Sequence, residues 1–79
     1  MKQTLRGPGI RIELDSDEIN HDDPGAGTPA MVYVGRETGT YWCMVETGET
    51  LGGTMLTKRQ NQWLEDQRHL VDKFMEENG

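Results

Sequence analysis

The chain has 79 residues, with 14 acidic and 8 basic side chains, a net charge of −6 and an isoelectric point near 4.7. A chain this short forms one small domain at most, here residues 1–79, and it buries a thin core. Its acidity argues against nucleic acid as a direct ligand, and the lack of a long apolar run argues against a membrane partner.

The first clear element is a strand over residues 9–15. Residues 1–6 have weak strand character and are followed by Gly7-Pro8-Gly9, which interrupts regular secondary structure. Apolar residues at Ile10, Ile12 and Leu14 then alternate with charged residues. This period of two predicts a strand with one face toward a core.

Residues 16–29 read as an acidic and Pro/Gly loop, in which two Pro and two Gly within residues 23–29 exclude a helix or a central strand. Strands are expected over 30–35 and 40–47, joined by a five-residue hairpin loop bounded by Gly. On the second strand Tyr41, Cys43 and Val45 would share one face, with Cys43 as a small core residue. Trp42 and Met44 would share the other face, so both faces are apolar.

The last part of the chain changes to a helical period. Gly48–Thr54 reads as a loop, in which a brief fourth strand around Thr50-Leu51 stays open. A helix is predicted over about 57–77 with Thr57 as its N-cap. We expect it to pack against Ile10, Ile12 and Leu14, and its contacting residues to be Trp63, Leu70 and Phe74.

Together these elements predict an α+β fold in the order β-β-β-α. A small antiparallel sheet of three, or four, strands would carry one C-terminal amphipathic helix on one face. A single helix covers only one face of a sheet. Trp42 and Met44 are therefore expected at a contact surface on the other face.

The net charge is concentrated in residues 13–23. This stretch holds six carboxylates and no Lys or Arg, while the remaining eight acids balance the eight bases. A focused negative patch acts on partners through its field. The charges of the helix run against its macrodipole, with Lys58 and Arg59 first and Glu76 and Glu77 last. Either this weak effect is tolerated, or these charges meet groups outside the helix, such as the acidic stretch.

No pattern of catalytic or metal-binding residues is present. Asp15 and Asp17 offer oxygen ligands suited to calcium, but Asn20 stands where an EF-hand turn needs Gly. One Cys and two His are too few to form a structural zinc site. Neither His21 nor His69 has the spacing to Cys43 that a catalytic thiolate–imidazole pair would show. We therefore expect a protein that is not an enzyme and holds no cofactor or metal.

The leading hypothesis is a non-enzymatic protein-binding module. Its acidic stretch would occupy a basic, nucleic-acid-binding site on a larger protein or nucleoprotein complex by charge mimicry. In composition the chain resembles small acidic accessory proteins of phages and other mobile elements, which implies an inhibitor of a host defence protein. This resemblance covers no motif and carries over no residues. The expected partner-binding residues are Glu13, Asp15, Asp17, Glu18, Asp22, Asp23, Trp42 and Met44.

Two alternatives remain open. One is a homodimer or small structural subunit that buries an apolar sheet face around Trp42 and Met44, and a weaker one is a divalent-metal-binding protein. The single Cys43 excludes an intrachain disulfide and fits a reducing compartment, and the N-terminus lacks the apolar segment of a signal peptide. We therefore expect a cytoplasmic location.

Overall fold

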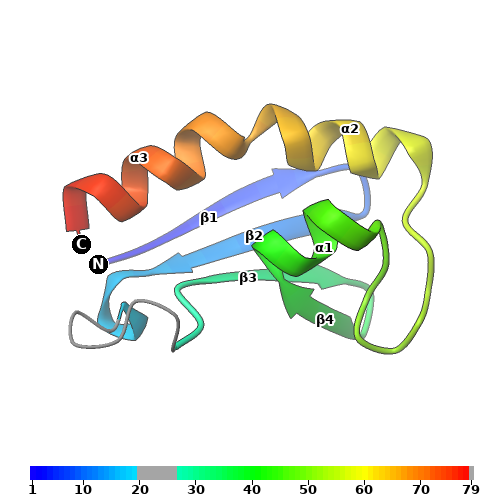
Figure 1. Ribbon diagram of the computed structural model, residues 1–79, viewed down its shortest axis with the longest axis horizontal. Coiled ribbons are helices and arrows are strands. Elements are labelled where there is room, and N and C mark those ends of the chain that lie inside the picture. The colour runs from blue at the N-terminus through cyan, green and yellow to red at the C-terminus, as the bar shows by residue number, and fades with distance from the viewer. Residues whose placement is uncertain (20–26, 79) are drawn as a thin grey trace.

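A four-stranded antiparallel sheet forms the centre of the computed structural model, which describes residues 1–19 and 27–78 (Figure 1). Its strands stand in chain order, β1-β2-β3-β4. The elements are β1 (Lys2–Gly7), β2 (Ile10–Asp15), the 3₁₀ turn η1 (Ser16–Glu18), β3 (Ala30–Val34), β4 (Glu37–Thr40), α1 (Tyr41–Thr47), α2 (Lys58–Asp66) and α3 (Arg68–Asn78). The predicted α+β class is confirmed.

The additional strand is β1, at the N-terminus, and not the segment around Thr50-Leu51. Pro8 and Gly9 form a two-residue turn between β1 and β2, with Gly9 at φ 68°. Proline followed by a glycine with positive φ is the pattern of a type II turn. The predicted interruption at Gly7-Pro8-Gly9 is therefore a hairpin turn. It allows residues 2–7, whose strand character is weak, to pair along the whole of β2.

The predicted strand over 40–47 is wrong. The β3–β4 hairpin closes through Gly35 and Arg36 alone, rather than five residues, and β4 ends at Thr40. The next seven residues form α1, which Gly48 ends in the left-handed conformation while its N–H donates to the Met44 carbonyl. Tyr41 and Met44 stand three residues apart and are both buried, which is helical spacing.

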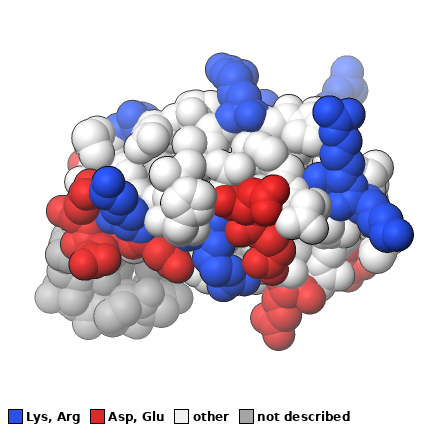
Figure 2. Space-filling view, turned by 90° about the horizontal axis from the view of Figure 1, so that it is seen from above, with Lys and Arg blue, Asp and Glu red and all other residues white. Residues whose placement is uncertain are grey.

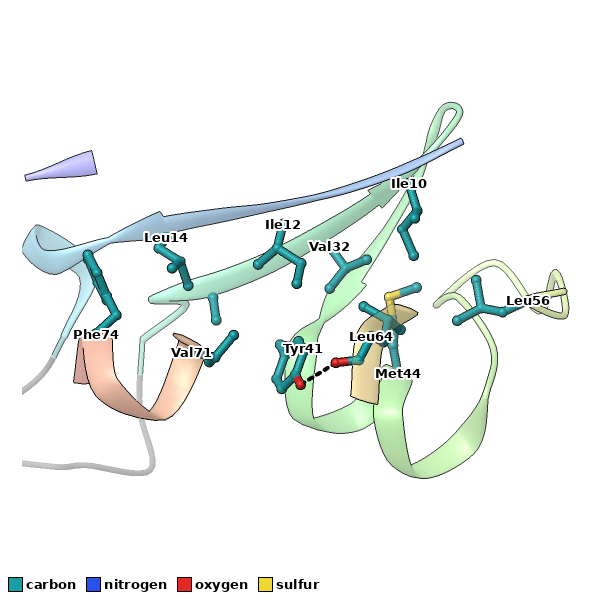
Figure 3. Close-up of a cluster of buried hydrophobic side chains, with 11 residues drawn as sticks. Ile10, Ile12, Leu14, Val32, Tyr41, Met44, Leu56, Leu64, Val71 and Phe74 are labelled. Carbon is teal, nitrogen blue, oxygen red and sulfur yellow. Dashed lines mark hydrogen bonds between the residues drawn. The ribbon is translucent and has the colours of Figure 1, made fainter. Parts of the chain in front are cut away.

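The core lies between one face of the sheet and the three helices (Figure 3). The predicted inward residues of β2 are confirmed as its centre, and Ala30 and Val32 of β3 continue it. The helices contribute Tyr41, Met44, Leu64, Val71 and Phe74, and the loop before α2 adds Leu56. Cys43 is exposed, and its predicted place in the core is wrong, because α1 turns it away from the sheet.

The C-terminal helix is divided into α2 and α3 at Gln67. Thr57 is the predicted N-cap, and it forms a capping box with Gln60. The buried Tyr41 hydroxyl donates to the Leu64 carbonyl at 2.6 Å. The Gln67 amide also donates to that carbonyl, at 3.2 Å, so Tyr41 and Gln67 share it at the point where α2 ends.

The predicted helix contact holds for Phe74, which is buried, and for the half-buried Trp63. It is wrong for Leu70, which is 36% exposed, whereas the next residue, Val71, is fully buried. Consecutive residues are about 100° apart around a helix. The inward stripe therefore runs through Leu64, Val71 and Phe74.

Gly7 lies directly beneath the Trp63 indole, and a Cβ on Gly7 would overlap the ring. We expect Gly7→Ala to cost about 2 kcal/mol of unfolding free energy through overpacking. Urea denaturation measures this loss. In a Trp63→Leu background the same substitution should be neutral or stabilising, since alanine suits a strand better than glycine. An equal loss in both backgrounds would contradict the contact.

Candidate binding surfaces

The helices leave the second face of the sheet open. Because side chains alternate along a strand, the residues between the core positions point to this open face. It carries Arg11, Glu13 and Asp15 from β2, their cross-strand neighbours Lys2, Thr4 and Arg6 from β1, and Met31 and Tyr33 from β3. Figure 3 shows the core side chains and the helices together on the opposite side.

Four carboxylates of the predicted acidic stretch gather where β2 ends, and we name Glu13, Asp15, Asp17 and Glu18 the acidic end. Asp15 caps η1, because its carboxylate accepts a hydrogen bond from the Asp17 amide at 3.0 Å. Asp17 and Glu18 are exposed. The other two predicted acids, Asp22 and Asp23, lie outside the described residues.

Ion pairs neutralise the acidic end only weakly. Glu13 lies 3.9 Å from Arg11, and Asp15 lies 3.8 Å from Lys2. Pairs this long between partly exposed side chains contribute little free energy. Within residues 1–19 and 27–78, no closer ion pair holds these carboxylates, and the exposed Asp17 and Glu18 can meet a positively charged group from outside.

A hollow of about 290 Å³ opens on the sheet face at the acidic end. Glu13, Asp15 and Glu18 line it, and the half-buried Met31 and Tyr33 add apolar surface. Burial, and then the neighbouring Glu13 carboxylate, raise the pKa of Tyr33. Its hydroxyl thus stays protonated at neutral pH, and the hollow combines negative charge with an aromatic contact surface.

Basic side chains gather at the other end of the strands, and we name Arg6, Arg11, Arg36, Lys58 and Arg59 the basic end. Both hairpin turns lie there, and α2 begins there (Figure 1). Gln60 near the start of α2 donates to the Pro8 carbonyl at 3.1 Å. Lys58 and Arg59 therefore lie at the other end of β2 from Asp15, Asp17 and Glu18 and form no ion pair with these three residues.

The charge of the molecule is thus partly separated along its long axis. In Figure 2, Lys and Arg side chains gather at the right-hand end and Asp and Glu side chains border the undescribed residues on the left, where a basic side chain also lies, and side chains of both signs lie between the two ends. Five of the eight bases belong to the basic end. Sequence reasoning found the acidic stretch but missed the basic end, because its five residues come from separate parts of the chain.

The predicted apolar surface around Trp42 and Met44 does not form. Met44 is 1% exposed and belongs to the core, whereas Trp42 is 42% exposed on the outer side of α1. In a strand the two side chains would share a face, but in a helix they lie about 200° apart. Met44 is therefore no contact residue. The strand period did offer a signal for Met31 and Tyr33, which sequence reasoning left out.

Within residues 1–19 and 27–78, no three His, Cys, Asp or Glu side chains lie close enough together to hold a metal ion. None of the helices in the same ranges is long and apolar enough to cross a membrane. Comparison of the chain with protein-family models, curated proteins and solved structures found no match.

Proposed function

We propose that this protein is a non-enzymatic binding module that occupies a basic site on a larger protein or nucleoprotein complex through its acidic end. The observation that carries the proposal is the position of the acidic end. Glu13, Asp15 and Glu18 line one hollow with Met31 and Tyr33 on the open sheet face, and Asp15 and Glu18 lie where β2 ends, away from both hairpin turns. An apolar centre with a polar edge is the usual composition of a protein interface.

Charge separation supports this use of the acidic end. A field of one sign at one end orients the molecule as it approaches a basic surface and raises the association rate. The hairpin turns of the basic end would lie away from such a partner, while Arg11 shares the open sheet face with the acidic end. Uniformly scattered charge of the same total would provide no such orientation.

The specific form that we propose is a cytoplasmic inhibitor of the phage accessory kind. Its carboxylates would stand in for nucleic-acid phosphates on the binding site of a host defence protein. Competition is the expected mechanism, because a site filled by carboxylates cannot hold phosphates. An arginine from that site would place its stem against Met31 and its guanidinium among Glu13, Asp15 and Glu18.

The test is the association rate with a partner isolated by affinity capture at low salt. Neutralising the acidic end by Glu13→Gln, Asp17→Asn and Glu18→Gln should slow association roughly tenfold or more at low salt. The control triple Glu46→Gln, Asp66→Asn and Asp72→Asn removes the same charge from exposed positions elsewhere. We expect it to slow association less than about threefold.

Two results would refute the proposal. An equal loss in both triples would mean that only the net charge matters, as expected if the acids serve solubility. An association rate of the unmutated protein that does not change between low and high salt would exclude charge mimicry, because salt screens exposed charges.

A further inference from the structure

We propose that the basic end contains a binding site for a phosphate group, formed by Arg6 and Arg11 on the open sheet face. This site lies toward the hairpin turns and adjoins the acidic end, because Arg11 lies 3.9 Å from Glu13 and Tyr33 lines both hollows. It goes beyond the proposed function, and its test needs no protein partner.

Arg6 and Arg11 form an unfavourable pair of like charges. Arg6 and Arg11 stand directly opposite each other in the β1–β2 register, on the same face of the sheet. Like charges in this arrangement destabilise a sheet. Arg11 has one carboxylate near it, Glu13 at 3.9 Å, and Arg6 forms no ion pair among the described residues. An anion between the two guanidinium groups would remove the repulsion.

A hollow beside these two arginines has room for a small ligand. Arg6, Arg11 and Tyr33 border a hollow of about 280 Å³, in which Gly7, Gly9 and Gly35 leave space free of side chains. The Arg11 guanidinium lies 4.4 Å from the centre of the Tyr33 ring. This stacking holds the guanidinium in place, so that less side-chain entropy is lost on binding.

Phosphate fits this arrangement better than a single carboxylate does. Two planar guanidinium groups can each donate two hydrogen bonds to a tetrahedral oxyanion of charge near −2. The remaining bases of the basic end, Arg36, Lys58 and Arg59, add to the positive field. The net charge of −6 opposes a long polyanion, so we expect a small phosphate compound rather than a nucleic-acid duplex.

Titration with sodium pyrophosphate at constant ionic strength tests the site by nuclear magnetic resonance. The side-chain Nε–H signals of Arg6 and Arg11 should shift and saturate, with a dissociation constant on the order of 1 mM. Arg6→Gln and Arg11→Gln should each weaken binding about tenfold. Lys58→Gln removes the same charge from the same end but lies outside the hollow, and it should change binding less than about twofold.

A parallel titration with a short oligothymidylate identifies the source of the phosphate. Tighter binding of pyrophosphate would indicate a free phosphate compound, and tighter binding of the oligonucleotide would indicate a nucleic-acid backbone. The proposal is overturned if no signal saturates. Equal weakening by all three variants would also overturn it, because a diffuse positive field would then explain the binding.

Discussion

Replacing Leu64 by alanine should remove about 3 kcal/mol of unfolding free energy. Leu64 is fully buried in α2, where it packs with Tyr41 and Met44 inside the core. Its truncation loses the transfer free energy of the side chain and leaves a cavity, which together cost roughly 2–5 kcal/mol in known cores. A domain of this size has about 4–12 kcal/mol in total, so a large part of its stability would be lost.

The matched control is the same substitution at Leu70, on the first turn of α3. Leu70 is 36% exposed, and its removal opens no enclosed cavity. We expect a loss below about 1 kcal/mol. Urea denaturation of the two variants measures both values. A similar loss at the two positions would contradict the inward stripe through Leu64, Val71 and Phe74, and would favour the stripe predicted from the sequence.

Raising the pH above 10 should destabilise the protein through Tyr41. The pKa of Tyr41 is raised to about 12, mainly because the side chain is buried. Its hydroxyl donates a hydrogen bond to the Leu64 carbonyl. In the unfolded chain the same group titrates near 10.0. Below pH 10 both states hold the proton, and stability is unaffected. Between pH 10 and 12 only the unfolded chain releases it, so the free energy of unfolding falls by about 2 kcal/mol.

The variant Tyr41→Phe separates this contribution from other groups that titrate at high pH. At neutral pH it should lose about 1 kcal/mol, because the hydrogen bond to Leu64 is gone. Between pH 10 and 12 its stability should fall less steeply than that of the unmutated protein, while Tyr33 still titrates in both. Urea denaturation at a series of pH values measures the two curves. Parallel curves would show that Tyr41 does not resist ionisation.

These two predictions depend on the same packing, since Tyr41 connects α1 to the point where α2 ends. Its ring fills the core beside the sheet, and its hydroxyl donates to the Leu64 carbonyl in the last turn of α2. Leu64→Ala and Tyr41→Phe therefore affect neighbouring groups. Their combined loss should differ from the sum of the single losses, as is usual for residues in contact.

Elements with a strong local pattern could be predicted from the amino-acid sequence. Alternation in Ile10–Leu14 predicted β2 and its inward face, and Thr57 predicted the start of α2. Local signals sufficed because a strand period and a capping side chain depend on a few neighbouring residues. The acidic stretch was visible for the same reason, since its described members are consecutive or nearly so.

The helical conformation of residues 41–47 depends on tertiary contacts. This run contains β-favouring residues, and its apolar positions fit both a period of two and a helical spacing. The sheet resolved the ambiguity: Gly39 of β4 contacts Met44, and the core needs Tyr41 and Met44 on the same side. A helix satisfies that requirement, whereas a strand would turn the two side chains to opposite faces.

Tertiary structure also decided which charges meet. Arg6, Arg11, Arg36, Lys58 and Arg59 come from two hairpins and a helix start, and only the pairing of β1 with β2 places Arg6 opposite Arg11. Similarly, Met31 and Tyr33 join Glu13 because β3 pairs with β2 in one register. The two-residue Pro8-Gly9 turn fixes the first of these registers locally, whereas the pairing of β3 with β2 depends on core packing across the sheet, so no local pattern specifies the hollow at the acidic end.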